Sequence, residues 1–454
     1  LIIPANTLAS GGYAVDNSCR FNSAGDDKMD RTIESPTLGT KFTFSTWIKK
    51  DLNGDYHHIL TSSANPGNFD IIRFDNSDNL QVIFQGGGDT LTTDREFRDV
   101  AAWYNIVVAV DTTQGTAANR VKIYINGTQE TSFSTETYPD QNLIVNYQVS
   151  GKTLRIGANT WDTSTGHEKL GGVICETVFI DGVAHAPTDF GEFDEDSGIW
   201  KPIDISGLTF GNNGFYLDYQ DSSALGNDVS GNNNDFSTSG LTAIDQSTDT
   251  CTNNWSTINA VAVAIANVPT LSDGNLTALS TSGANASIIG NMAVSSGIWY
   301  YELKWLSGTS GDFVAKVGWG NPDVYPNMHT ASIVYRNSDG KKYIDNTGTS
   351  YGATWTSAGD IIGVLLDLDS GTKTIRFYKN DADQGAITLS GAIDDGTFFI
   401  PYLDLGNTDK VSFNFGSPPY AISSGNTDAN GYGNFEFSTK GGYALNTKNL
   451  AEYG

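Results

Sequence analysis

Apolar and polar residues alternate over short stretches of this chain, and turn-forming residues separate the stretches. From Val121 to Ile125 every second residue is apolar, and Asn126-Gly127 follows directly. Both central residues of a tight two-residue hairpin turn take a positive φ, which Asn and Gly tolerate best. The pattern therefore predicts a β-hairpin centred on Asn126-Gly127.

Two other turn signals also follow apolar runs. Asp181-Gly182 comes directly after an apolar run at 178–180, and Asp369-Ser370-Gly371 separates residues 361–366 from 374–378. We expect a hairpin at each place. The unbroken apolar run 361–366 predicts a strand that is covered on both faces. Because no long stretch repeats with the helical period, the sequence predicts an all-β fold, and the irregular strand spacing favours sandwiches over barrels.

The composition changes twice along the chain. Residues 220–254 are crowded with Asn, Asp, Ser, Gly and Thr, which is typical of loops and linkers, and a second loop-rich stretch covers 417–433. We therefore expect two sandwiches in tandem, residues 1–245 and 246–418, followed by a short C-terminal tail over 419–454. The first sandwich includes a connector over 190–245.

The chain of 454 residues is strongly acidic, with 26 Lys and Arg against 52 Asp and Glu and a formal net charge of −26. Nucleic-acid binding needs a surface rich in Lys and Arg, so this charge argues against a nucleic-acid partner. It also argues against adsorption to an anionic membrane. Apolar runs stay well below the roughly 20 residues that span a bilayer, so membrane insertion is not expected.

The cysteine, histidine and tryptophan positions give further expectations. Cys19, Cys175 and Cys251 are odd in number and far apart, which predicts buried thiols rather than a disulfide framework. His57-His58 lies in a predicted loop. Four tryptophans fall inside strand patterns and are expected in the core, namely Trp47, Trp103, Trp299 and Trp319.

The first sandwich resembles a laminin-G-type, concanavalin A-like module. The resemblance is carried by residues 42–49, 103–111, 121–127, 154–157 and 171–176. In many such modules an acidic Asp-x-Ser…Gly-Asn-Asp element opens the domain, whereas here its likeness, residues 221–228, closes it. We interpret this departure as a circular permutation, which compact domains tolerate because their ends often lie close together.

The second sandwich resembles a SPRY domain, which is a bent sandwich of two sheets. Residues 297–302 are similar to the opening strand of that family, and 316–320 follow. Residues 360–380 fit its central hairpin, and 399–402 with 413–416 fit its closing strands. The two resemblances together imply two concanavalin A-like sandwiches of the jelly-roll type.

Nearly the whole chain resembles structural proteins of marine tailed bacteriophages, in which a laminin-G-like module precedes a SPRY-like one. The connector segment 190–202 and the ending 444–450 carry this likeness. It implies a virion surface protein, such as a tail fibre, a receptor-binding knob or a capsid decoration, made in the host cytoplasm. It also implies a homo-oligomer, with a trimer favoured, whose partners are other virion proteins or a host-surface glycan.

Catalysis is not expected, and we predict no catalytic residue. A retaining glycosidase needs two carboxyls about 5–5.5 Å apart. The run comparable to the laminarinase-type pattern, 192–196, has Asp196 where that pattern has Glu, and it lies in the connector. We interpret the run as a solvated acidic turn.

Calcium is the cofactor that the sequence suggests, because it binds six to eight oxygens from Asp, Asn and carbonyl groups. Two acidic clusters could supply them; the first is Asp26 and Asp27 with Asp30, and the second is Asp218, Asp221, Asn227 and Asp228. Under the permutation these clusters would lie on neighbouring strands. The alternative is that the same residues cap turns through Asx hydrogen bonds.

Two predicted loops carry aromatic side chains that suit a ligand. Trp161 has His167 nearby in the first sandwich, and Tyr325 with His329 occupies a comparable loop of the second, where SPRY modules commonly bind peptides. The alternative for each is a loop side chain packed on its own sandwich.

The leading hypothesis from the sequence is a non-enzymatic surface protein of a tailed-phage particle. A secreted or cell-surface lectin, dependent on calcium, is the second hypothesis, and a polysaccharide depolymerase is the third.

Overall fold

The computed structural model describes residues 12–65, 67–160, 168–262, 268–280, 286–308, 315–406 and 408–454. Over these residues the fold is all-β, as predicted, and its α-helix is the short α1 (Thr447–Tyr453). The residues divide by their contacts into two compact units, one ending at Thr252 and the other beginning at Asn253. We call them the N-terminal and the C-terminal unit.

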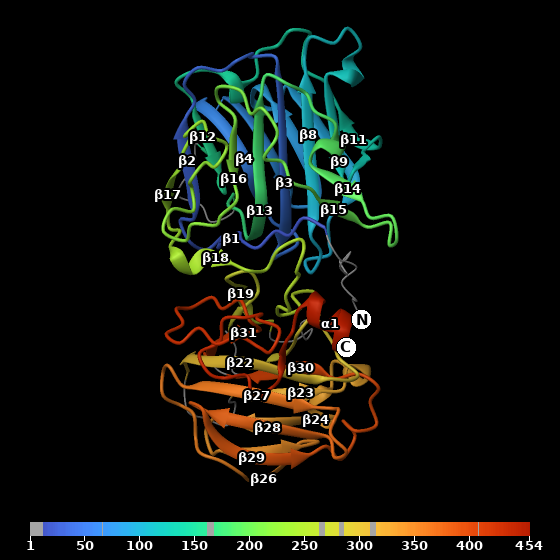
Figure 1. Cartoon of the computed structure of the whole chain (residues 1–454), viewed down its shortest axis with the longest axis vertical. Coiled ribbons are helices and arrows are strands. Elements are labelled where there is room, and N and C mark those ends of the chain that lie inside the picture. Colours follow the sequence, from blue (N-terminus) through green and yellow to red (C-terminus); the bar gives the residue numbers. More distant parts are fainter. Residues whose placement is uncertain are drawn as a thin grey trace. The chain divides into compact units, whose positions relative to one another are not determined.

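The N-terminal unit contains two large antiparallel sheets, sheet 1 and sheet 2 (Figure 1). Sheet 1 consists, in spatial order, of β10 (Thr128–Gln129), β9 (Val121–Ile125), β8 (Tyr104–Asp111), β3 (Lys41–Lys50), β13 (Gly172–Asp181), β1 (Ser18–Phe21) and β18 (Gln246–Ser247), and β16 (Phe215–Leu217) also pairs with β13. Sheet 2 consists of β11 (Phe133–Glu136), β7 (Asp89–Glu96), β6 (Asn79–Phe84), β5 (Asn68–Phe74), β4 (His57–Asn65), β12 (Thr153–Ile156), β2 (Lys28–Thr32) and β17 (Ser237–Ser239). A separate hairpin pairs β14 (Gly191–Phe193) with β15 (Trp200–Pro202).

The C-terminal unit also contains two large sheets, sheet 3 and sheet 4. Sheet 3 consists of β19 (Thr270–Ser272), β20 (Thr277–Leu279), β31 (Lys410–Asn414), β22 (Ile298–Ser307), β27 (Ile361–Asp367), β28 (Thr374–Lys379) and β29 (Ala382–Thr388), and β32 (Tyr443–Ala444) runs parallel to β22. Sheet 4 consists of β21 (Ala286–Ile289), β30 (Ile400–Leu405), β23 (Lys316–Gly320), β24 (Ser332–Arg336), β25 (Lys341–Ile344) and β26 (Thr347–Ser350). Short 3-10 helices in the two units are η1 (Gln85–Gly87), η2 (Ala117–Asn119), η3 (Asn146–Gln148), η4 (Pro187–Asp189), η5 (Ala243–Asp245), η6 (Pro322–Val324) and η7 (Met328–Thr330).

Two of the three predicted hairpins are confirmed. Asn126 and Gly127 take φ values of 47° and 77° and join β9 to β10, and β27 pairs with β28 as predicted. The hairpin predicted at Asp181-Gly182 is wrong, because β13 pairs with the distant β16 instead. The Asp181 carboxylate accepts hydrogen bonds from the backbone N–H groups of Thr37 (2.7 Å) and Asn213 (2.9 Å), so it fastens two loops instead of turning the chain back.

Sheet 1 is buried on both faces at its centre, and all ten residues of β13 are buried. Ile174 and Phe179 belong to the core cluster that includes residues of both sheets. Val178 belongs to a separate cluster with Phe190 and Phe210. Part of the predicted connector therefore covers a face of sheet 1 and adds to the hydrophobic burial of this unit.

The predictions for tryptophan and cysteine are confirmed, and the one for histidine is wrong. The four tryptophans assigned to the core are buried, and the three cysteines are free, buried thiols. His57 and His58 are buried at the start of β4, not in a loop. Nδ1 of His57 accepts from Gly171 N–H (3.2 Å) and its Nε2 lies 3.1 Å from the Leu52 carbonyl, so backbone groups satisfy the ring, and burial lowers its pKa to about 4.

The predicted C-terminal tail is packed into the C-terminal unit. Phe435 and Ala444 are fully buried, and the buried Glu302 carboxylate accepts from the backbone N–H groups of Glu436 (3.0 Å) and Phe437 (2.8 Å). Asn446 caps α1 by accepting from the N–H of Asn449 (2.9 Å). The helices found in the described residues are too short to cross a membrane.

Candidate ligand-binding site

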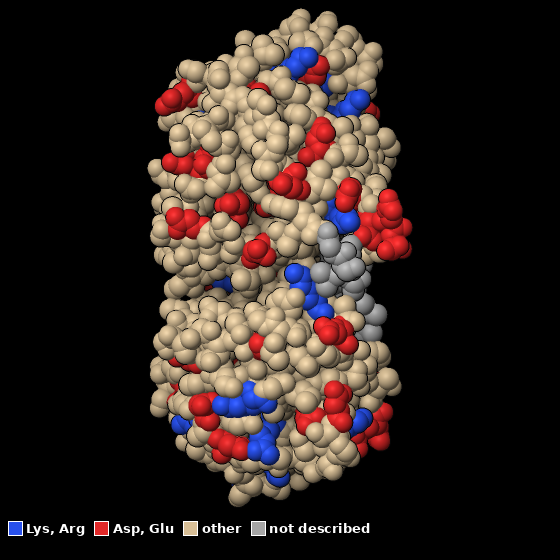
Figure 2. Space-filling view, viewed as in Figure 1, with Lys and Arg blue, Asp and Glu red and all other residues tan. Residues whose placement is uncertain are grey.

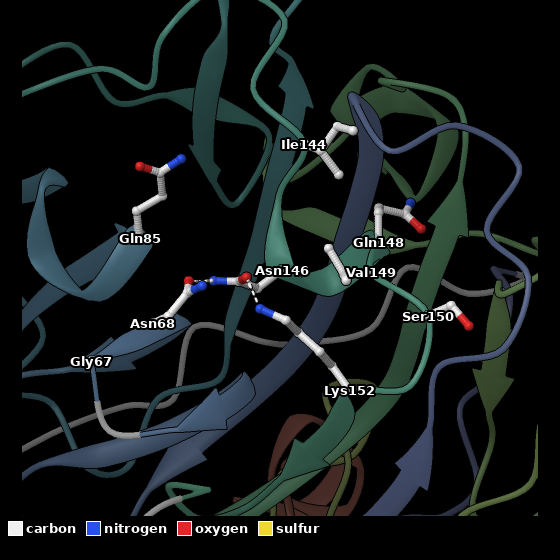
Figure 3. A pocket seen from close by; sticks show the side chains of 9 residues that line it. All are labelled: Gly67, Asn68, Gln85, Ile144, Asn146, Gln148, Val149, Ser150 and Lys152. Atoms are coloured by element: carbon white, nitrogen blue, oxygen red, sulfur yellow. Dashed lines mark hydrogen bonds between the residues drawn. The ribbon is translucent and has the colours of Figure 1, made fainter.

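A pocket of about 910 Å³ opens beside sheet 2. Its walls come from the turn between β4 and β5, from η1, from η3 and from the segment that leads into β12 (Figure 3). We call it the amide pocket, and its lining residues are Gly67, Asn68, Gln85, Ile144, Asn146, Gln148, Val149, Ser150 and Lys152.

A buried carboxylate beneath the amide pocket holds these segments together. Asp70, in the middle of β5, is fully buried. Its Oδ2 accepts from Asn146 N–H (2.5 Å), and its Oδ1 accepts from Asn146 Nδ2 (2.8 Å) and Gln85 N–H (3.0 Å). Asp70 therefore fastens both η1 and η3 to sheet 2. Burial raises its pKa to about 6, although these hydrogen bonds act in the opposite direction.

The Asn146 side chain is fixed from several directions. Besides Asp70, its Nδ2 donates to Asn68 Oδ1 (2.9 Å), and its Oδ1 accepts from Lys152 Nζ. The Asn146 carbonyl accepts from the Ser62 hydroxyl (3.0 Å). The centre of the amide pocket is thus set before any ligand arrives, which lowers the entropy cost of binding.

The groups that face solvent in the pocket are polar amides and a hydroxyl beside an apolar edge. Asn68, Gln85 and Ser150 are exposed, and Ile144 is 58% exposed. Amides both donate and accept hydrogen bonds, as sugar hydroxyls do, and an aliphatic side chain suits the C–H face of a sugar ring. The described lining residues therefore offer amides, one hydroxyl and one ammonium to a ligand.

Gly86 allows two backbone segments of the pocket wall to approach each other closely. Gly86 in η1 has a φ of 70°, and a Cβ at this position would lie 2.5 Å from the carbonyl oxygen of Gly67. Only glycine meets both demands without displacing the β4–β5 turn.

The sequence predictions did not include the amide pocket, although one signal was present. Asp70 stands alone among Phe69, Ile71 and Ile72. An isolated acid inside an apolar strand must find buried partners, and it therefore marks a polar centre.

The raised pKa of Asp70 predicts a pH-dependent stability. The folded protein keeps the Asp70 proton up to about pH 6, whereas the unfolded chain releases it near the ordinary aspartate pKa of 3.8. The free energy of unfolding of the wild type should therefore fall by about 3 kcal/mol, relative to Asp70→Asn, between pH 3.5 and pH 7. Urea denaturation at both pH values measures this difference. Asp16→Asn, at an exposed position, is the control, and an equal pH dependence of wild type and Asp70→Asn would contradict the prediction.

The aromatic loop candidates are only partly described. Trp161 and His167 lie outside the described residues. Tyr325 lines a smaller pocket of about 370 Å³ in the C-terminal unit, and its hydroxyl is buried there. His329 lies in η7 and is not among the residues that line that pocket.

The predicted calcium ligands form turns and pairs in the structure. In the first cluster, Asp26 pairs with Lys28 (2.8 Å) and Asp27 accepts from Asn22 N–H (2.7 Å). In the second cluster, the carboxylates of Asp218, Asp221 and Asp228 each accept a hydrogen bond from the N–H group two residues further along the chain. The N–H of Asn227 donates to the Ala224 carbonyl.

The structure does not bring the two clusters into one site. In the first cluster Asp26 and Asp27 precede β2 of sheet 2 and Asp30 lies within it, whereas the second cluster follows β16, which pairs with β13 of sheet 1. Over the described residues, no group of three or more His, Cys, Asp or Glu side chains is placed to share a metal ion. Calcium at these residues stays a prediction.

The acidic run 192–196 lies in and after β14. Glu192 is 58% exposed and pairs with Lys201 (3.3 Å), and Asp194 accepts from Ser197 N–H (2.9 Å) in a turn.

Comparison with known families matches both halves of the chain. The model described as the concanavalin A-like lectin/glucanases superfamily matches residues 24–184. The SPRY domain model matches residues 298–418.

Solved structures resemble single parts of the chain. The SPRY domain of human HERC1 is 18% identical, with 34% of this chain and 96% of that chain covered and a TM-score of 0.29. A heptameric SAP-like pentraxin from Limulus polyphemus is 15% identical, with 38% and 78% covered and a TM-score of 0.30. A candidate carbohydrate-binding protein from Bacteroides ovatus is 17% identical, with 51% and 60% covered and a TM-score of 0.35.

Proposed function

We propose that this chain, which combines a concanavalin A-like domain of the laminin G type with a SPRY domain, is a non-enzymatic recognition protein that binds a carbohydrate in the amide pocket. The observation that carries the proposal is the fixed polar centre of that pocket, where Asp70 and Asn146 hold η1 and η3 in place. Such a centre keeps the exposed Asn68 and Gln85 side chains ready for the hydroxyls of a sugar.

The proposed role is binding without chemistry. The acidic run that most resembles a glycosidase pattern is a solvent-facing hairpin end, paired with Lys201. The pocket lining offers amides and one ammonium, which can hold a ligand but supply no carboxyl pair for glycoside hydrolysis.

We also propose a place for the chain on the surface of a tailed-phage particle, as an oligomer. The likeness of 190–202 and 444–450 to phage structural proteins supports this, and so does a charge of −26, which keeps many copies soluble. A secreted, calcium-dependent lectin is the alternative. Mass spectrometry of purified virions separates the two, since absence from the particles would favour the lectin.

The carbohydrate proposal is tested with the full chain on a glycan array, followed by titration calorimetry with the best ligand. Gln85→Ala should weaken binding about tenfold, because the side chain is exposed in the pocket and truncation leaves a sugar hydroxyl unpaired. Gln129→Ala, an exposed glutamine on β10 of sheet 1, is the matched control and should change nothing.

Other results would redirect the proposal. Unchanged affinity in Gln85→Ala together with a loss in Tyr325→Ala would move the site to the pocket of the C-terminal unit. Loss of binding in a chelator would support the calcium proposal. The absence of binding to every glycan would refute carbohydrate recognition.

A further inference from the structure

The amide pocket differs in charge from the rest of the molecule. The chain has twice as many acidic as basic residues, and Figure 2 shows Asp and Glu spread over the visible face, with Lys and Arg at fewer places. In contrast, the nine residues that line the pocket include Lys152 and no Asp or Glu. Among the lining residues, the charged group that a ligand meets is therefore the Lys152 ammonium.

The Lys152 ammonium is held in place at the floor of the pocket. Its Nζ donates to Asn146 Oδ1 (Figure 3). Asn146 is fixed in turn by Asp70. An ammonium carries three N–H donors, and Asn146 takes one of them. The side chain is 9% exposed, so it has already lost most of its conformational freedom before a ligand binds.

The carboxylate beneath the pocket does not present itself to a ligand. Asp70 is fully buried, and its two oxygens already accept the three hydrogen bonds described above. It attracts the Lys152 ammonium, whereas the burial of Lys152 acts to lower the pKa of that group. A ligand thus contacts the donor and not the acid.

We propose that the amide pocket selects an acidic saccharide, with a carboxylate or sulfate on the ring accepting hydrogen bonds from Lys152 Nζ and the hydroxyls bound by Asn68 and Gln85. This inference rests on the proposed carbohydrate binding and names its ligand class. A hydrogen bond to a charged group is about twice as strong as one between neutral groups, so the anionic group carries much of the selectivity. The acidic surface would repel such a ligand at long range, and the fixed ammonium supplies the local attraction.

The test uses the full chain and two matched pairs of oligosaccharides. The first pair is oligogalacturonate and its methyl ester, which differ in the carboxylate charge. The second pair is a sulfated galactan oligomer and its desulfated form. Titration calorimetry should show at least about tenfold tighter binding of the charged member of one pair, and the pair concerned identifies carboxylate or sulfate as the recognised group.

Two variants locate the effect. Lys152→Gln should remove the preference, so that the charged and the neutral member of each pair bind with similar affinity. Lys122→Gln, with the same loss of charge on β9 of sheet 1, should behave like the wild type. The comparison of charged and neutral members in the wild type tests the inference even if Lys152→Gln folds poorly.

The outcomes separate this inference from the proposed function. Equal affinity for both members of both pairs, or a preference retained in Lys152→Gln, would overturn acidic selectivity while carbohydrate binding stands. Binding of no saccharide, charged or neutral, would overturn both.

Discussion

Replacing Asp249 with Ala should destabilise the N-terminal unit by about 3 to 5 kcal/mol, because it leaves a buried ammonium without its counter-charge. Lys49 on β3 and Asp249 form an ion pair in which the side chains are only 3% and 6% exposed. The Trp103 indole N–H also donates to Asp249 (3.2 Å). The loss is measured as the free energy of unfolding in urea.

Two further variants test whether the loss in the free energy of unfolding comes from removing the counter-charge of Lys49. In Lys49→Met combined with Asp249→Ala neither charge of this pair remains, so the double variant should be clearly more stable than Asp249→Ala alone. Asp26→Ala breaks the pair with Lys28, in which the Asp26 side chain is 55% exposed, and should cost about 1 kcal/mol or less. A loss of that small size in Asp249→Ala would contradict the assignment of a buried, stabilising pair.

Contacts between distant parts of the chain, such as the Lys49–Asp249 pair, explain why composition could not locate the end of the N-terminal unit. The sequence boundary at residue 245 follows the run of Asn, Asp, Ser and Gly. In the structure β18 pairs with β1, and the Thr250 hydroxyl donates to the Val15 carbonyl (2.7 Å). These partners lie more than 200 positions apart in the chain, so a local pattern carries no trace of them.

Local patterns predicted local structure well. The alternation before Asn126-Gly127 and the apolar run before Asp369 depend on neighbouring residues alone, and both hairpins form. Asp181-Gly182 has the same local form. It failed because its carboxylate binds Thr37 and Asn213, which come from distant loops, and this competition is decided by tertiary structure.

The amide pocket was beyond local prediction for a similar reason. Asn68, Gln85 and Asn146 come from three separate segments, and only their shared contacts with each other and with Asp70 make them a site. The aromatic residues chosen from the sequence were single-loop features. A search for isolated acids within apolar strands would have found Asp70, and with it the position of the polar centre.

A chain that ends at Pro418, the end of the SPRY match, should lose the folded C-terminal unit while keeping the N-terminal unit. The deletion removes the parallel pairing of β32 with β22 and uncovers Tyr300, which packs edge-on against Phe435 with ring centroids 5.3 Å apart. It also takes two backbone donors from the buried Glu302 carboxylate. Burial of each such aromatic is worth about 1.5 to 3 kcal/mol, so the summed loss approaches the whole stability of a domain.

Near-ultraviolet circular dichroism and urea denaturation of the full and shortened chains measure this loss, and the shortened chain should lack the transition of the C-terminal unit. Asp428→Ala tests the same packing with a point change. Its carboxylate accepts from the N–H groups of Tyr432 (2.9 Å) and Ala444 (3.0 Å) and from Asn449 Nδ2 (2.7 Å), so removing it leaves buried donors unpaired and should cost about 2 to 4 kcal/mol. If the shortened chain keeps both transitions at full amplitude, residues 419–454 are an appendage and do not stabilise the C-terminal unit.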